Sequence, residues 1–180
     1  MNARRIAMAG QGLLELLIAI AIAGALVKLA LPAYGNWIAR LEQRAAAEAL
    51  RHALDLARSE AIKRSSRVTV CQTNDGKICT GAGGWERGWL TFEDADANAE
   101  VDSPKRSLRS EPPMRPGITI EGNKPIAEYV SYTAYGQART LNGALQMGTF
   151  TVCRPGLAAI DVVLANSGRL RLEETAKPCP

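Results

Sequence analysis

Glu15 is a carboxylate placed inside a long apolar stretch of the chain. From Leu13 to Leu31 the sequence runs for 19 residues with only two charged residues, Glu15 and Lys28. An ionised carboxylate in lipid costs about 2.5–3.5 kcal/mol on insertion scales, so it needs a cationic partner. Glu15 therefore carries an energetic cost that the apolar stretch alone does not explain.

Four cysteines could form disulfides: Cys71, Cys79, Cys153 and Cys179. They form no C-x-x-C pair and the single histidine, His52, is distant in sequence, so no zinc site is expected. All four follow the apolar stretch, in a compartment where disulfides persist. Of three connectivities, we favour Cys71–Cys79, which closes a short loop, with Cys153–Cys179, which ties down the C-terminal tail. Four free buried thiols are the alternative.

No arrangement of residues typical of an enzyme is found. His52 lies in a helical pattern, with no second histidine and no thiol beside it in sequence, so no nucleophile–base pair is predicted. The acidic run 93–102 resembles the front of a calcium loop. However, the sixth position from Asp94 is Ala99 and the twelfth is Lys105, where such a loop needs Gly and Glu. We expect a solvated acidic loop, no metal, no cofactor and no enzymatic activity.

The apolar stretch has the length of a membrane span. At about 1.5 Å per residue it covers roughly 28 Å, close to the thickness of the hydrocarbon core of a bilayer. A leader with Arg4 and Arg5 precedes it, which predicts a cytoplasmic N-terminus. Two alternatives are a cleaved signal peptide, cut near Ala23–Ala25, and a plain single-pass anchor. Neither accounts for Glu15.

A second helical pattern follows the apolar stretch. Tyr34 and Trp37 come after Pro32, as aromatic residues do at a membrane–water boundary, and Pro32 should loosen the helix. From residue 38 to about residue 64 the pattern is amphipathic. Its narrow apolar stripe consists of Leu50, Leu54, Ala57 and Ala61, and its i,i+4 ion pairs are Arg51–Asp55 and Glu60–Arg64.

Beyond residue 67 the hydrophobic period changes to that of strands. Short alternating runs are separated by Gly, Asn and Pro, which favours antiparallel sheet. The fold class is therefore α+β, with a long N-terminal helix packed on a β-rich head. The basic, proline-rich segment 104–116 is expected to be an exposed loop. The expected strands are 68–71, 89–92, 118–120, 129–132, 148–153, 160–164 and 170–173.

Residues 10–32 resemble the class III signal of type IV pilins and pseudopilins. The matching features are Gly10, the apolar run, Glu15 at the fifth position after that glycine, and Pro32. The resemblance implies that a prepilin peptidase cuts after Gly10, that the new N-terminus at Gln11 is methylated, and that Glu15 pairs with the N-terminal amine of a neighbouring subunit. Gln11 departs from the family, which usually has Phe there.

Further short matches are similar to the FimT/FimU and GspH group of minor pilins and pseudopilins. They are 57–64, 68–71, 84–94 and 167–171. The resemblance implies a pilin-like fold and a subunit that primes or caps a fibre, with other major and minor pilins as partners. One branch of this group captures DNA through a Gly-Arg-x-Arg motif, which corresponds to Gly168, Arg169 and Arg171. A pseudopilin of a type II secretion system is the alternative.

The two arginines of this motif could bind phosphates. On a strand, side chains two residues apart point to one face about 7 Å apart, close to the phosphate repeat along one DNA strand. Contact with double-stranded DNA would then involve its backbone alone. A solvated edge strand guarded by charges is the simpler interpretation. The net charge of +4 neither demands nor excludes a nucleic-acid partner.

These expectations divide the chain into four segments. Residues 1–10 are a cytoplasmic leader, 11–33 a transmembrane or fibre-core helix, 34–66 an amphipathic helix that packs on the head, and 67–180 a periplasmic β-rich head. The protein is expected in a bacterial inner membrane as a single-pass protein, and afterwards in the fibre or at its tip.

Overall fold

The computed structural model describes residues 12–81 and 83–180, without the side chains at positions 13, 14, 29, 30, 32 and 33. After Ala39 the chain divides into two compact units. Helix α1 (Leu13–Arg64) begins in the first unit and ends in the second. The strands are β1 (Val68–Gln72), β2 (Trp89–Glu93), β3 (Ser107–Glu111), β4 (Thr119–Gly122), β5 (Tyr129–Tyr132), β6 (Gly148–Cys153), β7 (Ala158–Leu164) and β8 (Leu170–Pro178).

In the first unit, the described residues form the apolar part of α1. Large apolar side chains are exposed along its length, from Leu16 (63% exposed) to Leu31 (65% exposed). Tyr34 and Trp37 are also exposed, and their ring centroids lie 6.0 Å apart. In the described part of the chain, no helix combines the length and the apolar character that crossing a membrane requires.

The second unit is built around the rest of α1. Every residue of the expected apolar stripe is fully buried, from Leu50 to Ala61. The expected ion pairs are present on the other face, with 3.8 Å between Arg51 and Asp55 and 2.6 Å between Glu60 and Arg64. In this unit, helical periodicity alone identified the buried face of the helix.

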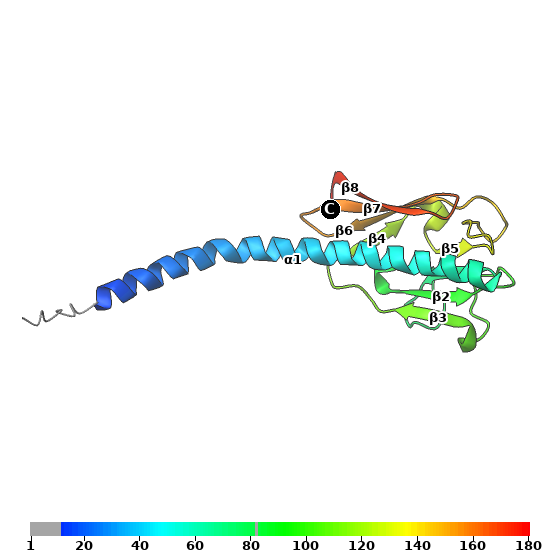
Figure 1. Ribbon diagram of the computed structural model, residues 1–180, viewed down its shortest axis with the longest axis horizontal. Helices are drawn as coiled ribbons and strands as arrows, with labels where there is room; N and C mark the ends of the chain where they lie inside the picture. Colours follow the sequence, from blue (N-terminus) through cyan, green and yellow to red (C-terminus); the bar gives the residue numbers. More distant parts are fainter. Residues whose placement is uncertain (1–11, 82) are drawn as a thin grey trace, which may run out of the picture. The chain divides into compact units, whose positions relative to one another are not determined.

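Two antiparallel four-stranded sheets complete the second unit (Figure 1). Their strand orders are β3-β2-β1-β5 and β4-β6-β7-β8. Both sheets and α1 contribute to one hydrophobic core, in which Val70 of β1 and Val162 of β7 are fully buried. Alternation within strands explains this core, because β1 points Val68 and Val70 inward and Thr69 and Cys71 to the opposite face.

Trp85 belongs to the hydrophobic core that both sheets share. It belongs to a short 3₁₀ helix, η1 (Trp85–Arg87), and is fully buried. Its ring meets Phe150 of β6 edge to face, with 5.1 Å between ring centroids, and its indole N–H donates to the carbonyl of Ala127 at 3.0 Å. Trp85 therefore connects the loop before β2 to the second sheet.

Two strand expectations need correction. The segment 104–116 is not a loop throughout, because it contains β3, which pairs with β2 at the edge of its sheet. The sequence of β3, Ser-Leu-Arg-Ser-Glu, is polar because an edge strand is half solvated. Strand β8 also continues beyond the expected residue 173 to Pro178.

Both expected disulfides are present: Cys71–Cys79 and Cys153–Cys179. The first joins β1 to the loop after it, and the second joins the end of β6 to the residue that follows β8. Cys179 also donates its backbone N–H to the carbonyl of Leu157 at 2.9 Å. The C-terminal tail is thus attached to the sheet by a covalent bond and a hydrogen bond.

Candidate functional site

The residues expected to act in processing and assembly lie in the N-terminal segment. Gly10 and Gln11 fall outside the described residues. Glu15 lies in the first turn of α1 and is exposed, and none of the ion pairs between described residues involves it. Pro32 lies within α1. A cationic partner of Glu15 is therefore still to be identified.

Gly168, Arg169 and Arg171 lie together in the hairpin between β7 and β8. Gly168 ends the turn, with a positive φ of 80°, and its N–H donates to the carbonyl of Ala165 at 2.8 Å. Arg169 follows it and is exposed, and Arg171 lies on β8 opposite Val163. The hairpin thus places the two arginines at the edge of the second sheet, where water or a ligand can reach them.

The two arginines differ in their surroundings. Arg171 forms an ion pair with Glu173 at 2.6 Å, because side chains two residues apart share one face of a strand. None of the ion pairs between described residues involves Arg169. The local charge is therefore weaker than two free arginines would give, and Arg169 is the better placed phosphate ligand.

Gly168 has a packing role that the motif does not reveal. A Cβ atom there would overlap the carbonyl oxygen of Gly136, and it would approach the Tyr132 ring to 3.1 Å and Arg58 Nε to 3.2 Å. A larger residue would therefore push apart the β7–β8 hairpin and the turn after β5. The glycine of the motif is required by the fold, whether or not the arginines bind a ligand.

Arg58 of α1 holds these two turns together. Its Nε donates to the Gly136 carbonyl at 2.9 Å, and its Nη2 donates to the Ser167 carbonyl at 3.2 Å. Beneath it, burial raises the pKa of the Tyr132 phenol well above its ordinary value, and the charge of Asp55 adds to this effect. No local pattern in the sequence marks Arg58, although it belongs to the matched segment 57–64.

The acidic run 93–102 is not solvated throughout, which corrects our expectation. Asp94 is fully buried. Its carboxylate accepts hydrogen bonds from the Thr69 hydroxyl at 2.7 Å, from the Asn98 N–H at 3.0 Å and from the Ala99 N–H. This carboxylate therefore fixes the loop on the sheet. In the described parts of the chain, no group of three or more His, Cys, Asp or Glu residues is arranged to hold a metal ion.

Comparisons with known proteins agree with this architecture. The model of the family described as type II transport protein GspH matches residues 46–168, more than half of the chain. A search of curated proteins found no significant match.

Two solved structures show the same fold. The chain is similar to the type IV minor pilin FimU of Pseudomonas aeruginosa, with 25% identity and a TM-score of 0.59 over 77% of this chain and 92% of that one. It also resembles the minor pseudopilin EpsH of Vibrio cholerae, with 14% identity and a TM-score of 0.51 over 76% of this chain and 99% of that one.

The family match spans most of the head, and both structural matches cover about three quarters of this chain. The expected α+β, pilin-like fold is therefore confirmed. The chain belongs to the GspH family, within the FimT/FimU–GspH group of type IV minor pilins and pseudopilins.

Proposed function

We propose that this protein is a minor type IV pilin that primes or caps the assembly of a pilus. The observation that carries the proposal is the row of large apolar side chains exposed along α1 from Leu16 to Leu31. Burying one such side chain is worth about 1.5–3 kcal/mol. The row therefore needs a cover, which lipid would supply before assembly and the helices of neighbouring subunits would supply within the fibre.

Glu15 gives this packing a specific partner. Within an apolar bundle, a carboxylate is stabilised by pairing with a cation, and the N-terminal amine of a neighbouring subunit is the cation we propose. Such pairing would fix the register between subunits. Residues 11–33 would then lie in the inner membrane or the fibre core, with the N-terminus on the cytoplasmic side and the head in the periplasm.

Cleavage after Gly10 is the first expected result. A prepilin peptidase would leave Gln11 as the mature N-terminus, which methylation then modifies. The mass of the N-terminal peptide from the membrane-bound protein measures both events. A mature protein that begins after Ala25 would instead indicate an ordinary signal peptide and would contradict the proposal.

Glu15→Ala should insert in the membrane and assemble poorly. Removing the charge favours insertion by up to about 3 kcal/mol, so a loss of fibres must come from the lost pairing. Membrane fractionation and fibre counts in a strain without the native protein measure the two effects. Glu48→Ala is the matched control, because its half-buried pair with Arg51, spaced i,i+3 on the helix, is worth about 0.5 kcal/mol or less. Normal fibre counts with Glu15→Ala would count against the proposal.

The same pair of variants addresses the second candidate, a pseudopilin of a type II secretion system. The similarity to EpsH favours this candidate at the level of the fold. If Glu15→Ala leaves fibre counts unchanged and stops secretion of a type II substrate, the pseudopilin is the better assignment. Both assignments share the helix packing and differ in the machine that contains the subunit.

DNA binding by the head is a further proposal, which the comparisons do not support. The observation in its favour is the exposed position of Arg169 beside the hairpin turn. One phosphate contact gives a salt slope of about −0.9, so affinity would fall only about threefold between 50 and 200 mM salt. Tight binding of double-stranded DNA would therefore require several subunits.

Arg169→Gln should weaken DNA binding more than Arg171→Gln, because Arg171 is paired with Glu173. Glutamine removes the charge and keeps much of the side-chain length, so the fold should persist. Fluorescence titrations of the full chain in detergent micelles, at low and moderate salt, measure the difference. If a variant with both substitutions binds DNA as the wild type does, or if neither protein binds DNA at low salt, this part of the proposal fails.

A further inference from the structure

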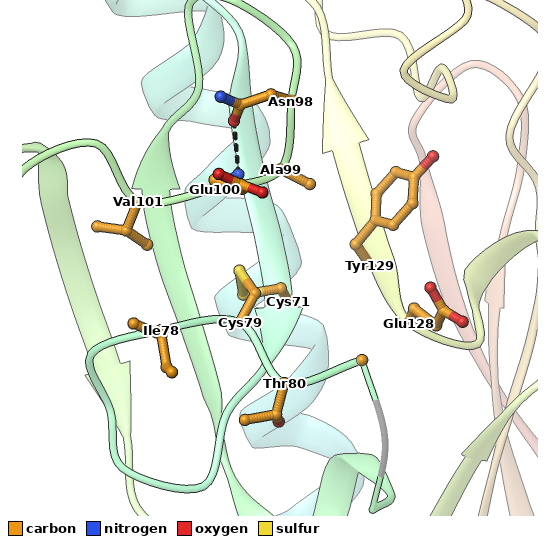
Figure 2. A pocket seen from close by; sticks show the side chains of 11 residues that line it. Cys71, Ile78, Cys79, Thr80, Asn98, Ala99, Glu100, Val101, Glu128 and Tyr129 are labelled. Carbon is orange, nitrogen blue, oxygen red and sulfur yellow. Dashed lines mark hydrogen bonds between the residues drawn. A yellow bond between two sulfur atoms is a disulfide. The ribbon is translucent and has the colours of Figure 1, made fainter.

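A cavity of about 490 Å³ lies on the outer face of the sheet β3-β2-β1-β5 (Figure 2). Its floor includes Cys71 of β1, on the face opposite the main core. One wall is the loop closed by the Cys71–Cys79 disulfide, and another is the loop at Asn98–Val101. Glu128, which precedes β5, and Tyr129, the first residue of β5, form the third side. Cavities that bind small molecules have volumes of about 300–1,000 Å³, so this one is large enough to receive a side chain.

The disulfide loop is held in place from both ends. The disulfide attaches Cys79 to β1, and the Thr80 N–H donates to the Gln72 carbonyl at 2.9 Å. Inside the loop, the Asp75 carboxylate accepts the N–H groups of Lys77 and Ile78 at 2.8 and 3.1 Å. The Lys77 hydrogen bond is the main cause that lowers the pKa of Asp75. This wall is therefore organised without a ligand.

The opposite loop is equally fixed. Buried Asp94 holds the backbone of Asn98 and Ala99, and the Glu100 N–H donates to the Asn98 side-chain oxygen at 2.6 Å. On the third side, the Tyr129 hydroxyl accepts the Leu141 N–H at 3.2 Å. Because bonds within the chain already hold all three sides, an occupant would not need to order them on binding.

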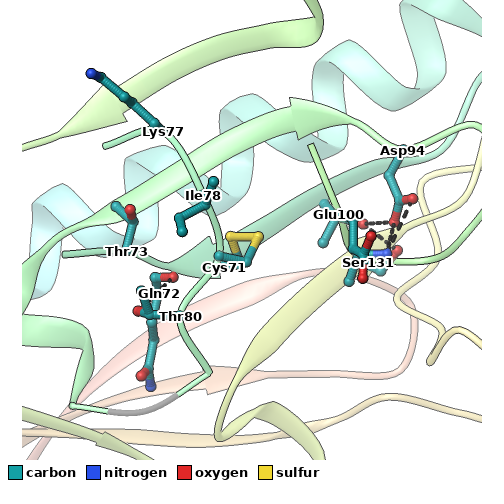
Figure 3. The surroundings of a disulfide bond; sticks show 12 residues. Cys71, Gln72, Thr73, Lys77, Ile78, Thr80, Asp94, Glu100 and Ser131 are labelled. Carbon is teal, nitrogen blue, oxygen red and sulfur yellow. Dashed lines mark hydrogen bonds between the residues drawn. A yellow bond between two sulfur atoms is a disulfide. The ribbon is translucent and has the colours of Figure 1, made fainter. Parts of the chain in front are cut away.

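The lining combines apolar side chains with two carboxylates. Ile78 is 57% exposed and, with Val101, the disulfide and Tyr129, provides the apolar surface. Glu100 and Glu128 are the two carboxylates of the lining, and both are exposed. Among the described residues that line this cavity, none is a lysine, an arginine or a histidine. Lys77, the one basic residue of the disulfide loop, extends away from the disulfide (Figure 3).

We propose that this cavity receives an arginine side chain from a neighbouring subunit of the fibre. The alkyl part of an arginine packs on apolar surface while its guanidinium remains with polar partners. That guanidinium forms strong charge-assisted hydrogen bonds with carboxylates and stacks on aromatic rings. The cavity offers these three features, and its uncompensated negative charge selects a cation. This inference rests on the proposed role as a fibre subunit.

Blocked amino acids test the chemistry without the fibre. The full chain in detergent micelles is titrated with N-acetyl-arginine methylamide and with the citrulline analogue, which has nearly the same shape and no charge. The methyl resonances of Ile78 and Val101 report occupancy. We expect saturable shifts with the arginine probe. The citrulline probe should bind at least about tenfold more weakly, because it cannot form charge-assisted hydrogen bonds.

Charge-neutral variants locate the binding. The double variant Glu100→Gln, Glu128→Gln should weaken the arginine probe about tenfold or more. Glu121→Gln is the matched control, because Glu121 is an exposed carboxylate on β4 in the other sheet and should leave binding unchanged. Equal binding of the two probes, or arginine binding that survives the double variant, would overturn the inference.

The occupant is tested in cells by a photoreactive residue at position 78. Cross-links to an arginine-containing peptide of another pilin of the same machine, lost in the Glu100, Glu128 double variant, would support the inference. Cross-links only to other proteins would overturn it. Glu15→Ala separates the two proposals, because it should abolish these cross-links while arginine binding in micelles persists. If the wild type forms fibres and does not bind the arginine probe, the arginine site is overturned and the proposed role as a fibre subunit is not.

Discussion

Trp85→Ala is expected to remove a large part of the stability of the head. Trp85 is fully buried, and its truncation leaves a cavity beside Phe150 and removes the edge-to-face contact with that ring. Large-to-small changes of this kind cost about 3–5 kcal/mol, against a typical total stability of about 5–15 kcal/mol. The Ala127 carbonyl keeps a second donor in Gln72 Nε2, so the main loss is packing.

The measurement is chemical unfolding followed by circular dichroism, with wild type and variant in the same detergent. Trp37→Ala is the matched control, because Trp37 is 56% exposed and exposed substitutions usually change stability by about 0.5 kcal/mol or less. If Trp85→Ala lowers the free energy of unfolding by less than about 1 kcal/mol, the core closes around the smaller side chain.

Gly168→Ala is expected to destabilise the head far more than Gly156→Ala. Both glycines have a positive φ, of 80° and 82°, so both substitutions incur about 1–2 kcal/mol of backbone strain. A Cβ at Gly156 meets nothing within 4 Å, whereas a Cβ at Gly168 overlaps the Gly136 carbonyl. That carbonyl is held by Arg58. We therefore expect Gly168→Ala to lower the free energy of unfolding by about 1–3 kcal/mol more than Gly156→Ala does, because it disturbs the hydrogen bonds of the charged Arg58.

Urea midpoints of the two variants measure this difference directly. Equal losses would show that the hairpin can move away from the turn after β5 without breaking the Arg58 contacts. The result also bears on DNA binding. Because Gly168 supports the fold, a loss of DNA binding in a Gly168 variant would say nothing about contact with DNA, and only the arginine variants test that contact.

Spacing patterns in the sequence correctly predicted the buried face of the helix and the pairing of the cysteines. The stripe from Leu50 to Ala61 is buried because one helix face meets the core, and helical spacing is visible in any sequence. Strand β3 was missed because its polar sequence at a sheet edge resembles that of a loop. The pairing of cysteines was predicted from loop closure and from the need to hold the tail.

The candidate sites depended more on contacts between distant segments. Gly168, Gly136 and Arg58 meet only after the two sheets pack on α1, so the packing role of Gly168 has no local signal. Asp94 was expected in solvent because its neighbours are acidic, and its partner Thr69 lies on another strand. For the same reason, the cavity beside the Cys71–Cys79 disulfide could not be foreseen, since three separate segments line it.

The attachment of Gln43 has a mechanical consequence for a subunit held in a fibre. The Gln43 side-chain amide donates to the carbonyls of Val152 and Ala158, both at 2.9 Å, and Gln43 is the first buried position of α1 in the head. A force applied along the helix would be transmitted to the sheet at β6 and β7. Cys153, next to Val152, carries the covalent link to the tail after β8. The force would thus be shared among β6, β7 and β8, and the edge strand β8 could not separate from the sheet by itself.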